Sequence, residues 1–405
     1  MISAHTIAAE VVIGPDIVPL AVTDAKVTLD EGWSPYVQAE LECALPADVE
    51  SIDPRSGAPR VRLRLWQRFG ESDPISVLSA AWAGLTLADL TAALAGTFLS
   101  GLSATYGRPY NAFGMRPSTS RLLDLSLRAR ETDHAAASMH LGLSSDEGMA
   151  QDYALVATSP ASPGSTSVRA ICSWALAYIG AALTAGTVDG EVEAEAVSWA
   201  PGQSLWDYLY PLVNAAGLRL WCDEHRDWHL GTPEDGTAGG LVLSAEQSVT
   251  RADQTIDRDG RWCDAVVVKY QWTDGSNVQH TVYDTATTPG YTKTKTVTYG
   301  RPYPGPGAAA ALLAREQGRG RELGMDAVSD YRAAPGQALT ATLPDIPIQT
   351  GIVSSVTWRL PDDEMTVTSR ALIDTPVTSW LFTPAGIAWE DVDPGVDWTE
   401  YEVEA

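Results

Sequence analysis

Short runs in which apolar and polar residues alternate dominate the first 70 residues, and this pattern restricts the fold more than any other feature. In residues 36–43, Val37, Ala39, Leu41 and Cys43 alternate with polar residues. Successive strand side chains point to opposite faces of a sheet, so one face of this strand should be buried and the other solvated. Similar runs at residues 7–13, 22–29 and 60–69 are separated by Pro, Gly, Asp and Ser clusters. These runs predict an antiparallel β domain.

The rest of the chain divides at changes of pattern and at stretches rich in Pro and Gly. Residues 123–129 and 139–143 resume the alternation, which predicts a barrel or sandwich that closes near residue 155. We expect no residue-level internal repeat. The expected domains are 1–160 with a helical insertion at about 75–118, 161–240 as a small α/β domain, 241–300 as a β-rich domain, 301–380 as a second mainly β domain, and 381–405 as an acidic aromatic tail.

The stretch from residue 202 to 230 predicts a helix followed by a hairpin. Ser204 with Asp207 three residues later is an approximate capping box, and Gly217 marks the end of the helix. Residues 218–222 and 228–230 are expected strands, joined by the polar turn 223–227. Pro211 lies inside the expected helix and removes one backbone hydrogen bond, at a cost of roughly 3 kcal/mol unless the helix bends.

The charge balance excludes several classes of partner. The 52 acidic and 27 basic residues give a net charge of −25, so the protein's field opposes binding to nucleic acid or anionic lipid. Residues 75–107 favour a soluble amphipathic helix over a membrane span, and we expect no stable membrane insertion. The N-terminus lacks the features of a signal peptide, which indicates synthesis in the cytoplasm.

No cluster in the sequence predicts catalysis, a cofactor or a metal. The cysteines form no Cys-x-x-Cys pair, and they are Cys43, Cys172, Cys222 and Cys263. Cys222, His225 and His229 lie near one another in sequence, but on a hairpin they would fall on different strands and in the turn, without a fourth zinc ligand. Nucleophile elbows, phosphate-binding loops and dinucleotide fingerprints are absent. We therefore assign no catalytic, cofactor-binding or metal residue and expect a protein that is not an enzyme.

The last 25 or so residues combine aromatic and acidic side chains. Trp389, Trp398 and Tyr401 are set among Asp and Glu residues, with no Lys or Arg. This composition is typical of a segment that orders against a partner, and a solubilising tail is the alternative. The three aromatic residues are our candidate partner contacts.

Motifs along most of residues 1–380 occur in an order that is informative, although each motif alone is weak. They are residues 33–39 (WSPYVQA), 45–46 (LP), 53–55 (DPR), 145–155 (SDEGMAQDYAL), 204–218 (SLWDYLYPLVNAAGL), 264–268 (DAVVV), 353–358 (VSSVTW) and 365–367 (MTV). Together they resemble the minor tail proteins of long-tailed, siphovirus-type bacteriophages, of the kind found in phages of actinobacteria, and more broadly the baseplate-hub family.

The resemblance implies a fold and a role in the virion. The implied fold class is α+β, mainly β, with β-barrel domains near both chain ends, at 1–160 and 301–380, and the small α/β domain inserted between them. The implied assembly is a homotrimeric ring at the tail tip, a structural hub that joins the tail tube to distal tail and tip proteins. Two alternatives stay open: a tail-associated hydrolase of the cell envelope, and a receptor-binding protein whose tryptophans, 14 in number, stack on a host-surface glycan.

Overall fold

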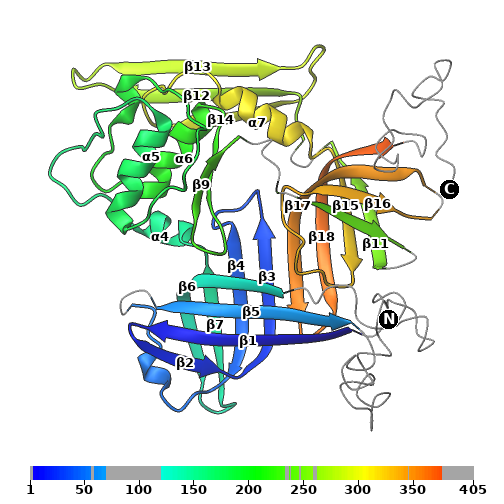
Figure 1. The fold of residues 1–405 in the computed structure, drawn as a ribbon. Helices are drawn as coiled ribbons and strands as arrows, with labels where there is room; N and C mark the ends of the chain where they lie inside the picture. The colour runs from blue at the N-terminus through cyan, green and yellow to red at the C-terminus, as the bar shows by residue number, and fades with distance from the viewer. Residues whose placement is uncertain are drawn as a thin grey trace, which may run out of the picture.

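The computed structural model describes residues 3–55, 59–69, 120–232, 237, 239–245, 248–258, 262–344 and 346–375. The expected helical insertion at about 75–118 and the acidic tail at 381–405 lie outside the described residues. The described part is mainly β. Figure 1 shows the N-terminal strands, in blue to cyan, beside the C-terminal strands, in orange, with the helical unit and a small sheet next to them.

The N-terminal strands form where the alternating pattern predicts them. They are β1 (Ser3–Ile13), β2 (Asp16–Leu20), β3 (Val22–Asp30), β4 (Val37–Ala44), β5 (Arg60–Phe69), β6 (Ser120–Asp133) and β7 (Ser138–Ser144). In β4 every second side chain is buried, from Val37 to Cys43, while Glu40 and Glu42 are exposed. The expected inward face of this strand is therefore confirmed.

The C-terminal strands pair with the N-terminal ones. They are β10 (Gly240–Ser244), β11 (Val249–Ile256), β15 (Arg321–Ala327), β16 (Ala338–Thr342), β17 (Ile348–Leu360) and β18 (Glu364–Thr375). Strand β17 is shared: residues 349–352 pair with β16 and residues 355–360 pair with β3. Irregularities between Thr350 and Ile352 and between Val353 and Ser355 mark where β17 changes partners.

The expectation of two separate β-barrels is wrong for the described residues. Their strands make one 13-stranded sheet in the order β11-β15-β18-β17-β3-β4-β7-β6-β5-β1-β2, with β10 and β16 attached at β17. The sheet is not closed, because its terminal strands β11 and β2 do not pair with each other. Alternation decides which face of a strand is buried but not which strand lies beside it, so the sequence pattern could not reveal the β17–β3 pairing.

The helix and hairpin predicted at residues 202–230 are confirmed. Helix α6 (Leu205–Ala215) begins after Ser204, whose hydroxyl accepts from the backbone N–H of Asp207 at 3.0 Å. Strands β8 (Arg219–Cys222) and β9 (Trp228–Gly231) form the hairpin. The same unit contains α4 (Glu147–Asp152) and α5 (Val168–Leu176).

Helix α6 accommodates Pro211 by replacing the missing donor. Proline cannot donate to the carbonyl of Asp207. The side-chain amide of Gln203 donates to that oxygen instead, at 3.2 Å, and Arg301 donates to the next carbonyl, of Tyr208, at 2.9 Å. The Gln203 side chain thus satisfies the carbonyl that the proline leaves without its helical donor, and Arg301 adds a donor one residue further along.

A third unit is a three-stranded sheet with one helix. Strands β12 (Ala265–Thr273), β13 (Gln279–Thr287) and β14 (Thr294–Tyr299) lie in the order β13-β12-β14, and helix α7 (Ala308–Gln317) packs against them. Strand β14 lies at one edge of this sheet. Gly307 precedes α7 with φ of 135°, and a Cβ there would collide with the carbonyl oxygen of Ala215 at the end of α6. This close approach joins the third unit to the second.

Each unit has its own hydrophobic core. The largest core combines side chains of the N-terminal and C-terminal strands, the second surrounds α5, α6 and the β8–β9 hairpin, and the third lies between α7 and β12–β14. The division into domains made from the sequence stays a prediction.

Candidate interaction site at the junction of the three units

The β8–β9 turn is organised by one carboxylate. Asp223 Oδ1 accepts from the backbone N–H of His225 at 2.8 Å and of Asp227 at 2.9 Å, and its Oδ2 bonds to His229 Nε2 at 2.8 Å. Burial works against ionisation of Asp223, but the bonds from His229, Asp227 and His225 outweigh it and hold the pKa of the carboxyl below its usual value. The same bond raises the pKa of His229. Trp221 stacks on the His229 ring, with centroids 5.2 Å apart.

This turn contacts the N-terminal sheet through charged side chains. Glu224 forms an ion pair with Arg121 of β6 at 2.6 Å, with both side chains about nine-tenths buried. The Glu224 carbonyl accepts from the backbone N–H of Asp124 at 2.7 Å. Arg226 pairs with the buried Asp146 at 2.7 Å. The polar turn therefore supplies the ion pairs that hold the hairpin on the sheet.

Arg121 connects the hairpin to the C-terminal strands as well. Its guanidinium donates to the carbonyls of Tyr331, at 3.1 Å, and Ala333, at 2.8 Å, and lies 5.1 Å from the centre of the Trp358 ring on β17. Because the same group pairs with Glu224, one side chain contacts three separate parts of the chain. Removal of Arg121 would leave the Glu224 carboxylate and the carbonyls of Tyr331 and Ala333 without this donor.

Glu147 makes a second buried connection. Its Oε2 accepts from the backbone N–H of Tyr36 and its Oε1 from that of Cys222, each at 2.9 Å, so α4 links the β3–β4 loop to the hairpin. Burial raises the pKa of Glu147 to about 7, although both backbone donors, Ser34 and Arg219 favour the anion.

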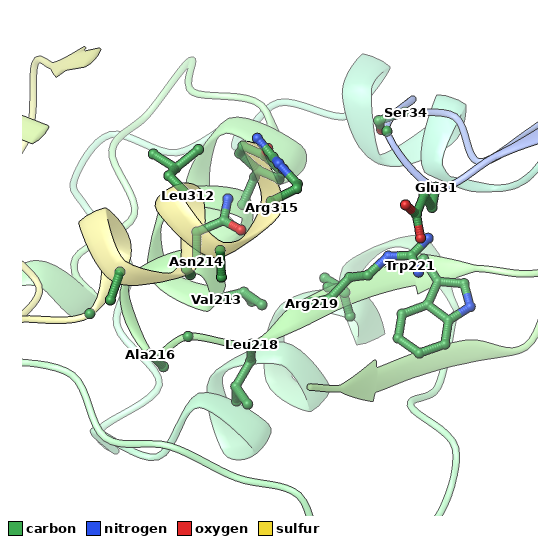
Figure 2. A pocket seen from close by; sticks show the side chains of 18 of the residues that line it. Glu31, Ser34, Val213, Asn214, Ala216, Leu218, Arg219, Trp221, Leu312 and Arg315 are labelled. Atoms are coloured by element: carbon green, nitrogen blue, oxygen red, sulfur yellow. The ribbon is translucent and has the colours of Figure 1, made fainter. Parts of the chain in front are cut away.

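A cavity of about 550 Å³ lies beside these contacts. Its walls come from all three units: the β3–β4 loop, α6 with β8, α7, and Arg370 of β18. Figure 2 shows Leu312 and Arg315 on α7, while Arg219 and Trp221 of β8 lie on the side of the loop residues Glu31 and Ser34. The size is within the range of roughly 300–1,000 Å³ that is usual for ligand sites.

The acidic side chains around the cavity have partners, whereas one arginine has no carboxylate partner among the described residues. Glu31 is paired with Arg370, and Glu147 with backbone donors. The Arg219 guanidinium lies 5.3 Å from the Tyr36 ring centre and 4.7 Å from that of Trp221, and it has no carboxylate within 4.0 Å among the described residues. Arg219 is therefore a cation with N–H donors available at the cavity wall.

The turn of the β8–β9 hairpin recurs in the β12–β13 hairpin. There, Asp274 Oδ1 accepts from backbone N–H groups in the turn, its Oδ2 bonds to His280 Nε2 at 2.8 Å, and Trp272 stacks on His280 with centroids 5.0 Å apart. Asn277, like Arg226 in the first turn, has a positive φ. The shared pattern is Trp-x-Asp followed by His six residues after the Asp, at 221–229 and 272–280. We expected no residue-level repeat from the sequence. This short one escapes notice because only four positions match: the Trp, the Asp, the residue with positive φ and the His.

The residues singled out from the sequence fall in different places. Cys222 is buried, and burial raises the pKa of its thiol far above the usual value. His225 is exposed in the turn, and His229 bonds to Asp223, so these residues do not converge on a common point. In the part of the chain that the structure describes, no group of three or more His, Cys, Asp or Glu side chains has a metal-binding arrangement. Trp389, Trp398 and Tyr401 lie outside the described residues.

The helices of the described ranges include none with the length and apolar character needed to cross a bilayer.

Sequence reasoning missed Arg121 and Arg219 as members of the junction. Arg121 occurs at the start of a strand in which charged residues are ordinary, and its partners are far away in sequence. The acidic pair Asp146 and Glu147 gave no clear signal either, because it lies in a polar stretch between Ser144 and Asp152. Both side chains are buried, and buried carboxylates need partners.

Comparison with known proteins gives matches in structure alone. No protein-family model matches the sequence, and no curated protein is similar to it. A tail protein from Neisseria meningitidis is similar in fold, with a TM-score of 0.52 and 12% identity over 90% of this chain and 96% of that chain. A 43 kDa tail protein of prophage MuSo2 from Shewanella oneidensis has a TM-score of 0.49 and 9% identity, over 90% of this chain and 98% of its own. A prophage tail protein from Listeria monocytogenes has the same score and identity, over 89% of this chain and 94% of its own.

These three structural neighbours are tail proteins. The chain shares its fold with the Neisseria tail protein over nearly the full length of both.

Proposed function

We propose that the protein is a structural component of a bacteriophage tail tip, a minor tail protein or baseplate hub that joins the tail tube to distal tip proteins. The observation that carries the proposal is the fold shared with a tail protein over 90% of this chain and 96% of the other. The proposal that the phage infects actinobacteria rests on the sequence motifs alone. The junction fits a scaffold, because its charged groups bind one another across units and leave a cavity instead of a reactive cluster.

The proposed assembly is a homotrimeric ring. Strands β2 and β11 are the two ends of the main strand order of the large sheet, and each presents backbone donors and acceptors on one edge. In β11 every residue from Thr250 to Ile256 is exposed, on both faces of the strand. A strand with this exposure in the isolated chain is suited to pairing or packing with another copy.

Native mass spectrometry and electron microscopy of the purified full-length chain test the proposal. We expect a species of three times the chain mass, seen as a ring with a central channel, and incorporation into tails when the other tail proteins are coexpressed. A chain that stays monomeric at high concentration and is missing from purified tails would overturn it. Lysis of host cell walls in a turbidity assay, abolished by one substitution, would favour the hydrolase instead.

A further inference from the structure

We propose that the cavity at the junction binds the acidic aromatic segment of the same chain, residues 381–405. This goes beyond the role in a tail and does not depend on it. The class of ligand is a peptide with aromatic rings and carboxylates, and no metal or cofactor is required.

The cavity wall offers two kinds of contact. Trp206, Tyr210 and Trp221 supply aromatic surface, and α7 supplies a row of small apolar side chains around Leu312. Arg219 supplies a cation without a carboxylate partner within 4.0 Å in the described part of the chain. An aromatic side chain can pack on such a wall while a neighbouring carboxylate pairs with the guanidinium.

The segment has the complementary composition. Its aromatic residues include Trp389, Trp398 and Tyr401, and it has no Lys or Arg. Its carboxylates are Glu390, Asp391, Asp393, Asp397, Glu400, Glu402 and Glu404. In a chain with a net charge of −25, an arginine at a cavity wall that forms no ion pair with the described residues is a site that attracts such a segment.

The segment can reach the cavity. Arg370 is at the cavity wall, and β18 continues from it to Thr375, a distance of about 17 Å at about 3.3 Å per residue. Residues 376–388 can span up to about 45 Å when extended. The tether therefore allows Trp389 to return to the wall, at an effective concentration on the order of millimolar, so that even modest affinity gives occupancy.

Hydrogen exchange of the full chain, followed by mass spectrometry, tests the inference. We expect amides within 381–405 to exchange at least about tenfold more slowly than those of a synthetic peptide of the same sequence. Arg219→Leu should remove this protection. The matched control is Arg64→Leu, because Arg64 lies over Trp66 at 5.6 Å on the N-terminal sheet, away from the cavity lining.

A second variant keeps the test valid if Arg219→Leu does not fold. Glu390→Gln with Asp391→Asn changes only the segment, and we expect it to weaken protection while the melting temperature of the three cores stays unchanged. Exchange as fast as in the free peptide, in the unaltered chain, would overturn the inference. Protection that survives both variants would do so too, because it would arise at another surface.

Cross-linking identifies the copy to which the segment belongs. A photoreactive phenylalanine analogue in place of Trp389, in an equal mixture of isotopically heavy and light chains, should cross-link to α6, β8 or α7 of the same chain. Cross-links formed only between heavy and light chains would overturn the assignment to the same chain.

Discussion

Replacing Glu147 with Gln should remove one pH-dependent part of the protein's stability. The carboxyl is buried and its pKa is raised from 4.5 to about 7. A raised pKa means that the folded state binds the proton more tightly than the unfolded state does. Stability from this group is therefore gained as pH falls from about 7 to about 4.5, and it is lost as pH rises through the same window.

The size of the effect follows from the shift. One pKa unit corresponds to about 1.4 kcal/mol, so the free energy of unfolding should be about 2–3 kcal/mol higher at pH 5 than at pH 8 through Glu147 alone. Glutamine cannot titrate. Its amide also places an N–H₂ group opposite one of the two backbone donors, Tyr36 or Cys222, which lowers stability at every pH without changing the pH dependence.

The measurement is denaturant unfolding of the wild-type and Glu147→Gln chains at pH 5 and pH 8. The quantity to compare is the difference in unfolding free energy between the two chains, because it cancels the titration of all other groups. Glu40→Gln is the matched control, since Glu40 is exposed on β4. We expect the difference for Glu147→Gln to be larger at pH 5 by about 2–3 kcal/mol.

Two outcomes would refute the reasoning. No change between pH 5 and pH 8 would mean that the backbone donors cancel the effect of burial. A difference that is larger at pH 8 would mean that the donors and Arg219 outweigh burial and that the anion is the preferred form.

Two further substitutions test the junction. Arg121→Met should lower the unfolding free energy by about 3–5 kcal/mol, since it leaves the buried Glu224 unpaired, and adding Glu224→Gln should restore part of the loss. The control is Arg55→Met, at an exposed pair with Asp53, which should change thermal stability little. An equal loss of stability in Arg121→Met and Arg55→Met would contradict the prediction. Asp223→Ala should cost about 1–3 kcal/mol by removing the acceptor for three donors. Asp274→Ala, at the corresponding position of the second hairpin, should shift the melting temperature less, because among the described residues its turn forms no ion pair with the large sheet. Equal shifts would show that the junction adds nothing to the first turn.

Local signals in the sequence predicted local structure well. Ser204 and Gly217 bounded α6, because capping and left-handed backbone are decided by a few neighbouring residues. The alternation in β4 gave its buried face for the same reason. Pro211 did not interrupt the helix. Gln203, a local residue, donates to the carbonyl of Asp207, and Arg301, which only the folded structure brings near, donates to that of Tyr208.

The arrangement between units could not be predicted. The pairing of β17 with β3 joins residues from opposite ends of the chain, and alternation is compatible with many partners. Arg121 lies on β6, and its partners come from the turn after β8, the loop after β15 and β17. The sequence showed the acidic turn and the pair Asp146 and Glu147, but it did not reveal that a cavity lies beside them.

The sharing of β17 has a consequence for biosynthesis. Strand β3 is made before its neighbour, residues 355–360, which follows only after β4 to β16 have been made. Until then the N-terminal sheet has an unpaired edge at β3, and such an edge is open to strands of other chains. In a polysome, several nascent copies are close together and each must wait for its own β17. The synthesis of β17 therefore decides whether the sheet is completed within one molecule or between two.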